Sequence, residues 1–269
     1  MKDYYYSIAS GSKGNCSLVC CGGSRFLIDL GVSVRSLKKT LAGLDLEIED
    51  LTGILLTHAH SDHIKGLETL VKKYDVPLYA SVGTAWEICE KVPTAKGKIS
   101  EFLAGSRFGL EQTEIQSVRT PHDSAESVGY VFAWRGGRLG FATDLGFMPS
   151  SVEEELLGCD TVVLESNHDL EMLAWGPYPE HLKARIRGNR GHLSNEDCAA
   201  CACDLVRSGT QRLILAHLSE TNNRPELALE TTQKRLAAEH LDCQVMVAPV
   251  KEMEQPLLLK GDAPCWVFD

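Results

Sequence analysis

The sequence predicts an α/β protein in which two β-sheets lie between layers of helices. Short apolar segments separated by glycine-containing turns fill the first half of the chain, and such segments are typical of strands. Longer helical segments alternate with short apolar strands in the last third, which is typical of layered α/β domains. No repeat and no Pro/Gly-rich linker divides the chain, so we expect a single domain over residues 1–269.

The first half is predicted to be rich in strands. Gly22-Gly23 and Gly136-Gly137 each separate two apolar segments and predict hairpin turns. A helix is expected from Asp62 to Tyr74, and a polar region rich in Gly and Pro precedes Gly191. The predicted strands are Tyr4 to Ala9, Ser17 to Cys20, Arg25 to Leu30, Gly53 to Thr57, Pro77 to Ala80, Thr113 to Arg119, Val128 to Trp134, Arg138 to Thr143 and Thr161 to Glu165.

The last third alternates more regularly. A helix is expected from Asn195 to Ser208, with Ser194 or Asn195 as its cap. A second helix is expected from Pro225 to Glu239, with proline in its first turn. The predicted strands are Arg212 to Ala216, Gln244 to Ala248 and Pro256 to Lys260.

Composition excludes some classes of protein. A net charge of −10 argues against a surface coated with basic residues for nucleic acid, but it is compatible with a local basic groove. The ten cysteines are expected to be reduced and mostly buried. No apolar run reaches the ~18 residues that span a bilayer, and the N-terminus does not read as a signal peptide. We therefore expect a cytoplasmic protein without membrane contact. Its oligomeric state is open, and a homodimer is possible.

The densest chemical motif is Thr57-His58-Ala59-His60-Ser61-Asp62-His63, directly after a predicted strand. Side chains alternate along extended backbone, so His58 and His60 share one side and can reach one ion. Asp62 and His63 would point to a neighbouring position about 3.5–4 Å away, as two-metal sites require. Imidazole and carboxylate together suit zinc, iron or manganese. A surface turn that is rich in histidine by chance is the weaker alternative.

This motif resembles the signature of the metallo-β-lactamase superfamily, and further residues follow in that family's order, each at the end of a predicted strand. The resemblance covers nearly the whole chain and implies a four-layer αββα fold. It also implies that Asp29, in Asp29-Leu30-Gly31, supports the metal site, although this tripeptide is also typical of a simple turn. His122 could otherwise be a loop histidine and Asp144 a helix cap. The implied ligands are His58, His60 and His122 for one ion, Asp62, His63 and His217 for a second, and Asp144 as a bridge.

A second motif, Gly191-His192-Leu193-Ser194-Asn195, precedes a predicted helix and resembles a segment of the phosphodiesterase branch of the superfamily. A helix N-terminus attracts an anionic phosphate, and a histidine beside it can donate a proton to the leaving oxygen. The alternative is a histidine next to a capping Ser194.

Three further segments resemble the YycJ/WalJ group of bacterial metallo-β-lactamase-fold proteins, whose members are regarded as DNA exonucleases acting from the 5′ end. These segments are Ser10 to Cys16, Thr143 to Gly146 and Glu165 to Asp169. The first is rich in glycine, so its backbone could approach a phosphate closely, or it is a surface turn. The residues expected to contact substrate or support the ligands are Ser12, Asn15, Asn167, His168, Ser194, Ser219 and Asn223.

Two features bear on nucleic-acid binding. Arg185, Arg187 and Arg190 form the densest basic stretch near a motif and are either a phosphate-binding patch or a solvated loop. Exposed aromatic residues could stack on the bases of a single strand. The candidates are Trp134, Trp175, Tyr178 and Trp266, although such residues are more often part of the core.

The expected chemistry is metal-assisted hydrolysis of a phosphodiester. Two divalent ions (Zn, Mn or Fe) would activate a water that attacks phosphorus in line. His192 would assist the leaving group, while Asp62 or Asp144 could steer the proton of the nucleophile. The favoured function is a 5′-to-3′ DNA exonuclease. One alternative is a hydrolase of small phosphodiesters or lactones, and another is a non-catalytic partner protein, which the complete set of ligands argues against.

Overall fold

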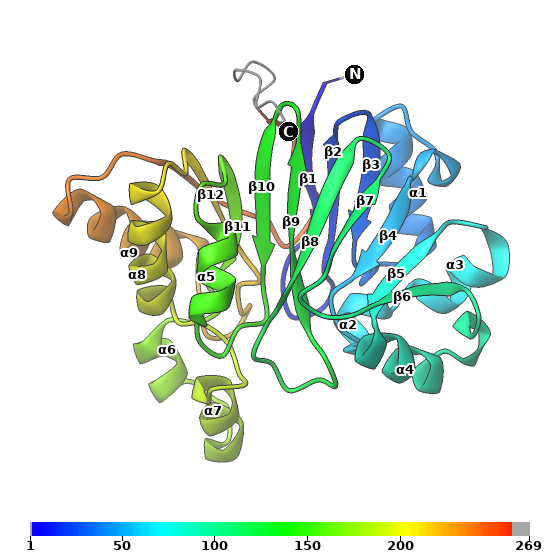
Figure 1. The fold of residues 1–269 in the computed structure, drawn as a ribbon. Coiled ribbons are helices and arrows are strands. Elements are labelled where there is room, and N and C mark those ends of the chain that lie inside the picture. The colour runs from blue at the N-terminus through cyan, green and yellow to red at the C-terminus, as the bar shows by residue number, and fades with distance from the viewer. Residues whose placement is uncertain (1, 260–269) are drawn as a thin grey trace.

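The computed structural model describes residues 2–259 and contains two seven-stranded sheets that pack face to face, with helices on both outer faces (Figure 1). This arrangement is the four-layer αββα sandwich that the sequence predicts. The prediction of one domain over residues 1–269 includes residues outside the described range and stays a prediction.

The first sheet combines an antiparallel and a parallel part. Strands β1, β2 and β3 pair antiparallel, whereas β3, β4, β5 and β6 pair parallel. The helices of this half are α1 (Val34–Gly43), α3 (Leu67–Lys73) and α4 (Val82–Lys91). The strands lie in the order β14 (Leu257–Leu258), β1 (Tyr4–Ala9), β2 (Cys16–Cys21), β3 (Ser24–Ile28), β4 (Gly53–Leu56), β5 (Leu78–Ser81) and β6 (Ile99–Phe102).

The second sheet has the same combination. Strands β8, β9 and β10 pair antiparallel, and β10, β11, β12 and β13 pair parallel. Its helices are α5 (Ser150–Leu156), α8 (Asn195–Arg207) and α9 (Pro225–Ala238). The strands lie in the order β13 (Gln244–Val247), β12 (Arg212–Ala216), β11 (Thr161–Glu165), β10 (Gly137–Ala142), β9 (Val128–Trp134), β8 (Thr113–Arg119) and β7 (Arg107–Leu110).

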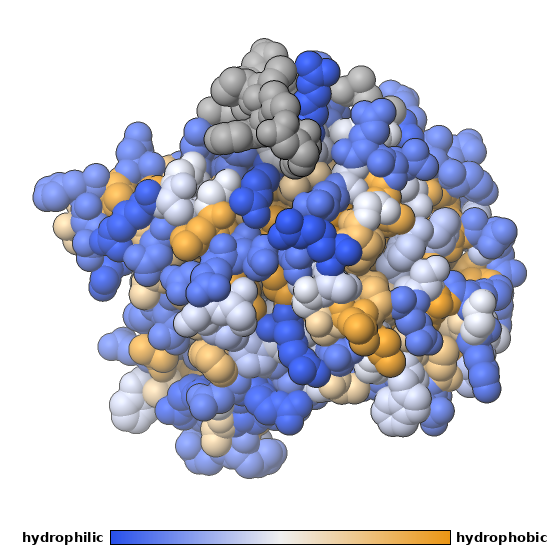
Figure 2. Space-filling view, viewed as in Figure 1, coloured by the Kyte–Doolittle hydropathy of each residue, from blue (hydrophilic) through white to orange (hydrophobic). Residues whose placement is uncertain are grey.

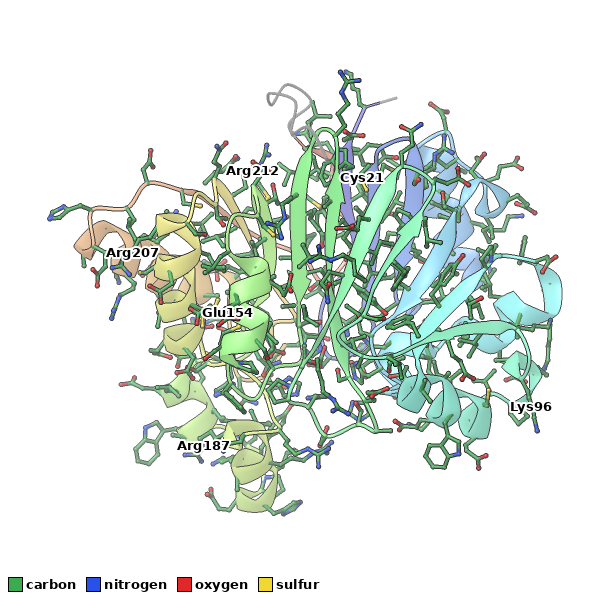
Figure 3. All side chains as sticks on the ribbon, viewed as in Figure 1. Cys21, Lys96, Glu154, Arg187, Arg207 and Arg212 are labelled. Atoms are coloured by element: carbon green, nitrogen blue, oxygen red, sulfur yellow. The ribbon has the colours of Figure 1, made fainter. Side chains whose placement is uncertain are left out.

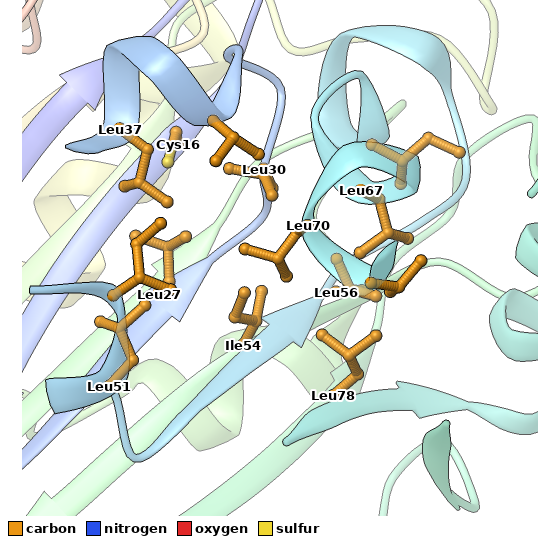
Figure 4. Packing of buried hydrophobic residues seen from close by; sticks show 14 of the residues in the cluster. Cys16, Leu27, Leu30, Leu37, Leu51, Ile54, Leu56, Leu67, Leu70 and Leu78 are labelled. Carbon is orange, nitrogen blue, oxygen red and sulfur yellow. The ribbon is translucent and has the colours of Figure 1, made fainter. Parts of the chain in front are cut away.

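The core has one apolar layer between the sheets and one under each helical layer. In β4, Leu55 belongs to the layer between the sheets, while Ile54 and Leu56 pack beneath the helices. Leu67 and Leu70 of α3 close over that outer face (Figure 4). Strand β4 is therefore buried on both faces, as strands within parallel sheets usually are. Each such leucine stabilises the fold by about 1.5–3 kcal/mol relative to an exposed position.

The predicted helix from Asp62 to Tyr74 is in fact two helices, α2 (Ser61–Ile64) and α3. Gly66 lies between them, and its backbone N–H donates to Leu30 O at 2.9 Å. A Cβ at this position would lie 2.3 Å from Val32 O, so only glycine permits this close approach. The break therefore follows from tertiary packing against the chain after β3.

Other boundaries also differ from the sequence prediction. Arg135 and Gly136 form the turn between β9 and β10, and Gly137 already belongs to β10. The region before Gly191 contains two helices, α6 (Leu170–Trp175) and α7 (Glu180–Arg187), where only a polar region was expected. The last predicted strand is limited to β14, and its final residue, Lys260, lies outside the described residues. Helices α1, α4 and α5 and strands β6 and β7 were not predicted.

The surface and the cysteines are ordinary for a globular protein. The face drawn in Figure 2 is mostly hydrophilic, with hydrophobic residues scattered over it. Nine cysteines of the described part are free thiols, and six of them are buried. Within residues 2–259, no helix combines the length and the apolar character needed to cross a membrane.

Candidate metal centre

The candidate site lies where the central strands of both sheets end. Neighbouring parallel strands finish at the same edge, so the residues that follow them meet. Asp29 follows β3, His58 follows β4, Asp144 follows β10, Glu165 ends β11 and His217 follows β12. This edge is the lower one in Figure 1, where α2, α6 and α7 also lie.

Asp29 fixes the start of the histidine-rich segment. Its carboxylate accepts hydrogen bonds at 2.8 Å from the backbone N–H of Thr57 and at 2.8 Å from the Thr57 hydroxyl. The same carboxylate lies 2.8 Å from His63 Nδ1. With Nδ1 held in this way, Nε2 of His63 is the atom left for the centre of the site, which is how carboxylates orient histidine ligands. Asp29 has a φ of 59°, a left-handed conformation that places its side chain under the segment.

His58, His60 and His122 form the first group of candidate ligands. His60 Nδ1 lies 3.3 Å from His122 Nε2. The Nδ1 of His122 lies 3.1 Å from Gly191 O, which leaves Nε2 for an ion. Burial lowers the pKa of His58 well below its usual range, so its imidazole stays neutral, and the neutral form is the one that binds metals.

Asp62, His63 and His217 form the second group. Asp62 Oδ2 lies 3.4 Å from His63 Nε2 and 3.7 Å from His217 Nε2. Asn15 joins the glycine-rich loop to this group, because its Nδ2 lies 3.1 Å from Asp62 Oδ2 and 3.1 Å from His63 Nε2. Its Oδ1 accepts from the backbone N–H of Gly11 at 3.0 Å.

Asp144 lies between the two groups. Its Oδ2 is 3.6 Å from His63 Nε2, and its Oδ1 is 3.6 Å from His122 Nε2. Burial opposes ionisation of this carboxyl, but the charges of His217 and His63 outweigh it and hold the pKa of Asp144 well below its usual range. Its φ of 61° is left-handed, like that of Asp29. Backbone conformations of this kind cluster at functional sites.

Glu165 is a site residue to which the sequence analysis assigned no role. Its Oε1 lies 2.8 Å from His192 Nδ1 and 2.7 Å from His217 Nδ1. Its Oε2 accepts from the backbone N–H groups of Leu145 at 2.9 Å and Leu193 at 3.1 Å. Burial alone would raise the pKa of Glu165, but the charge and hydrogen bond of His192 and the hydrogen bond of His217 lower it to about 2. The signal available in the sequence was a carboxylate at the end of the apolar strand β11.

The residues present fit divalent metal ions. His58 Nε2, His217 Nε2 and Asp144 Oδ2 are buried and have no hydrogen-bond partner among the described residues. Leaving such atoms unpaired costs about 1–3 kcal/mol each. Two ligands of one tetrahedral ion lie roughly 3.4 Å apart, and the His60–His122 and Asp62–His63 separations are 3.3 and 3.4 Å. Nitrogen and oxygen donors in this arrangement suit divalent metals.

The expected supporting residues divide into two sets. Ser12, Asn167 and Ser219 line the cavity in front of the candidate ligands, and the Asn167 amide also donates to His217 O at 2.9 Å. The other three lie behind the site and do not line that cavity. His168 is buried, Ser194 caps α8 through a 3.0 Å bond from Asp197 N, and Asn223 donates to Ser166 O at 2.9 Å.

The arginines and aromatic residues also divide. Arg185 lines the cavity, whereas Arg190 donates to His122 O and Ser124 O. Arg187 lies near the end of α7 (Figure 3) and donates to Lys183 O. Trp134 is buried and donates to Asp3, so it does not offer a stacking surface. Tyr178 lines the cavity, Trp175 is 88% exposed, and Trp266 lies outside the described residues.

The cavity in front of the ligands has a volume of about 380 Å³. Five of the candidate ligands and His192 line it, together with residues of the segment around α7, including Tyr178, Leu182 and Ile186. His192 is 21% exposed, and its Nδ1 is held by Glu165, so its Nε2 is free to meet a bound molecule. The cavity therefore brings candidate metal ligands, an imidazole and apolar side chains into one space.

Comparisons with known proteins agree with this architecture. Residues 24–218 match the family described as the beta-lactamase superfamily domain. Exodeoxyribonuclease YycJ of Bacillus anthracis is 38% identical over 84% of this chain and 86% of that protein. Exodeoxyribonuclease WalJ of Streptococcus pneumoniae serotype 2 is 35% identical over 87% of this chain and 88% of that protein. The chain therefore belongs to the beta-lactamase superfamily and, within it, to the group that contains YycJ and WalJ.

A solved structure supports the fold independently. The metallo-beta-lactamase fold protein YhfI from Bacillus subtilis superposes with a TM-score of 0.69 and covers 94% of this chain and 100% of its own. Its sequence identity is 16%, so this likeness concerns the fold alone. Family and site together identify a metal-dependent hydrolase.

Proposed function

We propose that the protein is a 5′-to-3′ DNA exonuclease that uses two divalent metal ions. The observation that carries the proposal is a cluster of seven candidate histidine and aspartate ligands, five of which line one cavity, in a chain 38% identical to an exodeoxyribonuclease. His58, His60 and His122 would hold one ion, Asp62, His63 and His217 the other, and Asp144 would contact both. A cytoplasmic location is part of the proposal, since chromosomal DNA is the substrate it implies.

The chain's own residues prepare the site for phosphodiester cleavage. When bound, two divalent ions activate water and neutralise the charge that develops on a phosphate. Asp29 and Glu165 orient His63 and His217 through their Nδ1 atoms, which fixes the atoms that face the centre. Either Asp62 or Asp144 would accept the proton of the attacking water, and the lowered pKa of both carboxyls and their position at the cavity support this role.

His192 is the proposed general acid. Its Nδ1–H donates to the buried carboxylate of Glu165, and this bond orients the ring. The imidazole would then transfer a proton from Nε2 to the oxygen that leaves phosphorus. Tyr178, Leu182 and Ile186 provide the apolar wall against which a base can lie.

The decisive experiment uses a DNA oligonucleotide labelled at either end, single- or double-stranded, with Mn²⁺ and Zn²⁺ supplied separately. We expect the 5′ label to appear at once in mononucleotides and the 3′ label to appear in a ladder of shortening fragments. Asp144→Ala should abolish both patterns. If instead the 3′ label appeared at once in mononucleotides and the 5′ label in a ladder of fragments, the enzyme would degrade DNA from its 3′ end. Wild-type protein that leaves DNA and RNA intact but cleaves bis(p-nitrophenyl) phosphate would instead be a small-molecule phosphodiesterase.

A further inference from the structure

A second cavity continues from the metal site. It has a volume of about 880 Å³ and shares Ser12, His60, Asp62 and Arg185 with the cavity that faces the candidate ligands. Its remaining walls come from the glycine-rich loop, the turn after α2 and the end of α4, and these helices both lie at the lower edge in Figure 1. We call it the α2–α4 groove. Its lining residues are Ser12, Lys13, His60, Ser61, Asp62, Ile64, Lys65, Glu68, Lys91, Val92 and Arg185.

More cations than acids line the groove, in a protein of net charge −10. Its cations are Lys13, Lys65, Lys91 and Arg185, and its acids are only two. One acid, Asp62, is a candidate metal ligand, so its charge would be offset by the ion. The other, Glu68, pairs with Lys72 at 2.6 Å on the exposed surface of α3. The groove is therefore a local exception to the acidic character of the chain and would attract a polyanion.

The cations differ in how firmly they are already paired. Lys91 is held by Glu87 at 2.8 Å and by Ala59 O at 2.9 Å, and Arg185 pairs with Asp123 at 2.5 Å. Lys13 pairs with Glu220 at 2.8 Å, but its side chain is 79% exposed, and pairs of this kind are weak in water. Lys65 is exposed and makes no ion pair or side-chain hydrogen bond with any residue from 2 to 259. Lys13 and Lys65 are thus the cations most available to a ligand.

We propose that the α2–α4 groove binds the sugar–phosphate backbone of the DNA strand on the 3′ side of the cleaved bond, with Lys13 and Lys65 contacting its phosphates. This inference rests on the proposed exonuclease function. An enzyme that removes nucleotides from the 5′ end holds the terminal nucleotide on the 5′ side of the cleaved bond and the rest of the strand on its 3′ side. The smaller cavity of about 380 Å³ suits the single nucleotide, and the larger one suits the remaining strand.

The test compares substrates that reach into the groove with substrates that do not. Single-stranded 20-mers, dinucleotides and bis(p-nitrophenyl) phosphate would be given to the Mn²⁺-loaded wild type and to variants Lys13→Ala, Lys65→Ala and the double variant. Lys39→Ala is the matched control, because Lys39 is an exposed residue of α1 that does not line the groove. Turnover of bis(p-nitrophenyl) phosphate reports whether the metal centre is intact.

We expect the double variant to raise KM for the 20-mer at least about threefold, and each single variant to reduce the salt dependence of log(kcat/KM) by about 0.7 per lost phosphate contact. Dinucleotide cleavage should keep its wild-type KM. Equal losses on 20-mer and dinucleotide, or an unchanged 20-mer KM and salt slope, would overturn the groove assignment while leaving the exonuclease function in place. Wild-type protein that leaves every oligonucleotide intact would overturn both.

Discussion

The two sheets have the same internal topology but contribute to the site in different ways. In each sheet, three antiparallel pairings are followed by three parallel ones, and β1 to β6 correspond to β8 to β13. The third strand of each set, β3 or β10, is followed by Asp-Leu-Gly, and both aspartates have a left-handed φ near 60°. Asp29 orients a histidine from behind, whereas Asp144 lies among the candidate ligands.

The first half supplies its candidate ligands from one continuous segment, and the second half supplies one residue from each of several strand ends. The geometry explains this contrast, because a single turn from β4 into α2 brings four side chains together, whereas the ends of β8, β10 and β12 contribute one residue each. The positions of the candidate ligands should therefore depend on the local packing of one segment in the first half, and on how several strands align with one another in the second half.

Replacing Asp144 should have the largest effect, because this carboxylate contacts residues of both halves. Asp144→Ala should lower kcat/KM by about 10³-fold or more, since metal stabilisation of a phosphoryl transition state is worth several kcal/mol. Metal content measured on the purified protein should fall with it. Asp204→Ala, an exposed residue of α8, is the control and should behave as wild type. Full metal content and full activity in Asp144→Ala would show that the halves do not share an ion.

Variants of the two supporting carboxylates, Asp29 and Glu165, should distinguish an effect on metal binding from an effect on proton transfer. Asp29→Asn should weaken metal binding about 10–100-fold, and kcat should recover at saturating metal. Glu165→Gln should weaken metal binding similarly, but kcat on DNA should stay low at saturating metal, because His192 loses its partner. Chelator competition gives the metal affinity.

A substrate with a good leaving group provides the control for the variants of Asp29 and Glu165. p-Nitrophenolate needs little protonation, so kcat of Glu165→Gln on bis(p-nitrophenyl) phosphate should approach that of wild type. An equal loss of kcat on both substrates would contradict the proposed role of the Glu165–His192 pair and leave Glu165 as a support of His217 only.

The contrast between the halves also explains what the sequence could predict. The segment Thr57–His63 is readable because its members are adjacent, and the strands around it have regular apolar patterns. For Glu165 the sequence offers only a carboxylate at the end of an apolar strand, and its role arises only when β11, β12 and the loop before α8 converge on it. The same holds for the groove cations, which lie far apart in the chain.

Missed helices have local explanations. Helix α6 is capped by Asp169, which accepts from Met172 N at 2.7 Å, and α7 begins directly after Pro179. Both signals are present in the sequence, but surrounding Gly and Pro residues predicted loops. The division of the helix after Asp62 had no local signal beyond Gly66, because the contact that requires glycine comes from Leu30 and Val32.

The glycines of the two Asp-Leu-Gly segments should test local packing in each half. A Cβ on Gly31 would lie 1.7 Å from Asp62 O, and a Cβ on Gly146 would lie 2.2 Å from the Asn189 carbonyl carbon. Each alanine variant should lose about 3 kcal/mol of unfolding free energy, the upper part of the range for overpacking. Gly31→Ala should also weaken metal binding, since it displaces Asp62.

Urea unfolding of the metal-free proteins measures this effect. Gly43→Ala is the control, because nothing lies within 4 Å of its added Cβ, and its stability should stay within about 0.5 kcal/mol of wild type. A Gly31→Ala protein as stable as Gly43→Ala would mean that the segment after β3 can move away from Asp62 at little cost.

The smallest expected effect concerns His168, which lies behind the site in the second half. Burial lowers its pKa to about 4, whereas an unfolded histidine titrates near ~6.5. The unfolded state therefore binds more protons between these values, and stability must fall as the pH drops from 6.5 towards 4. At pH 5 the loss relative to pH 7.5 should be about 2 kcal/mol for this residue.

Urea unfolding of EDTA-treated protein at the two pH values should show a smaller loss of stability in His168→Gln than in wild type, by about 2 kcal/mol. His181→Gln, exposed on α7, should retain the wild-type loss. Identical losses in wild type and His168→Gln would mean that water reaches His168, and that the strand ends of the second half are packed less tightly behind the site than the structure shows.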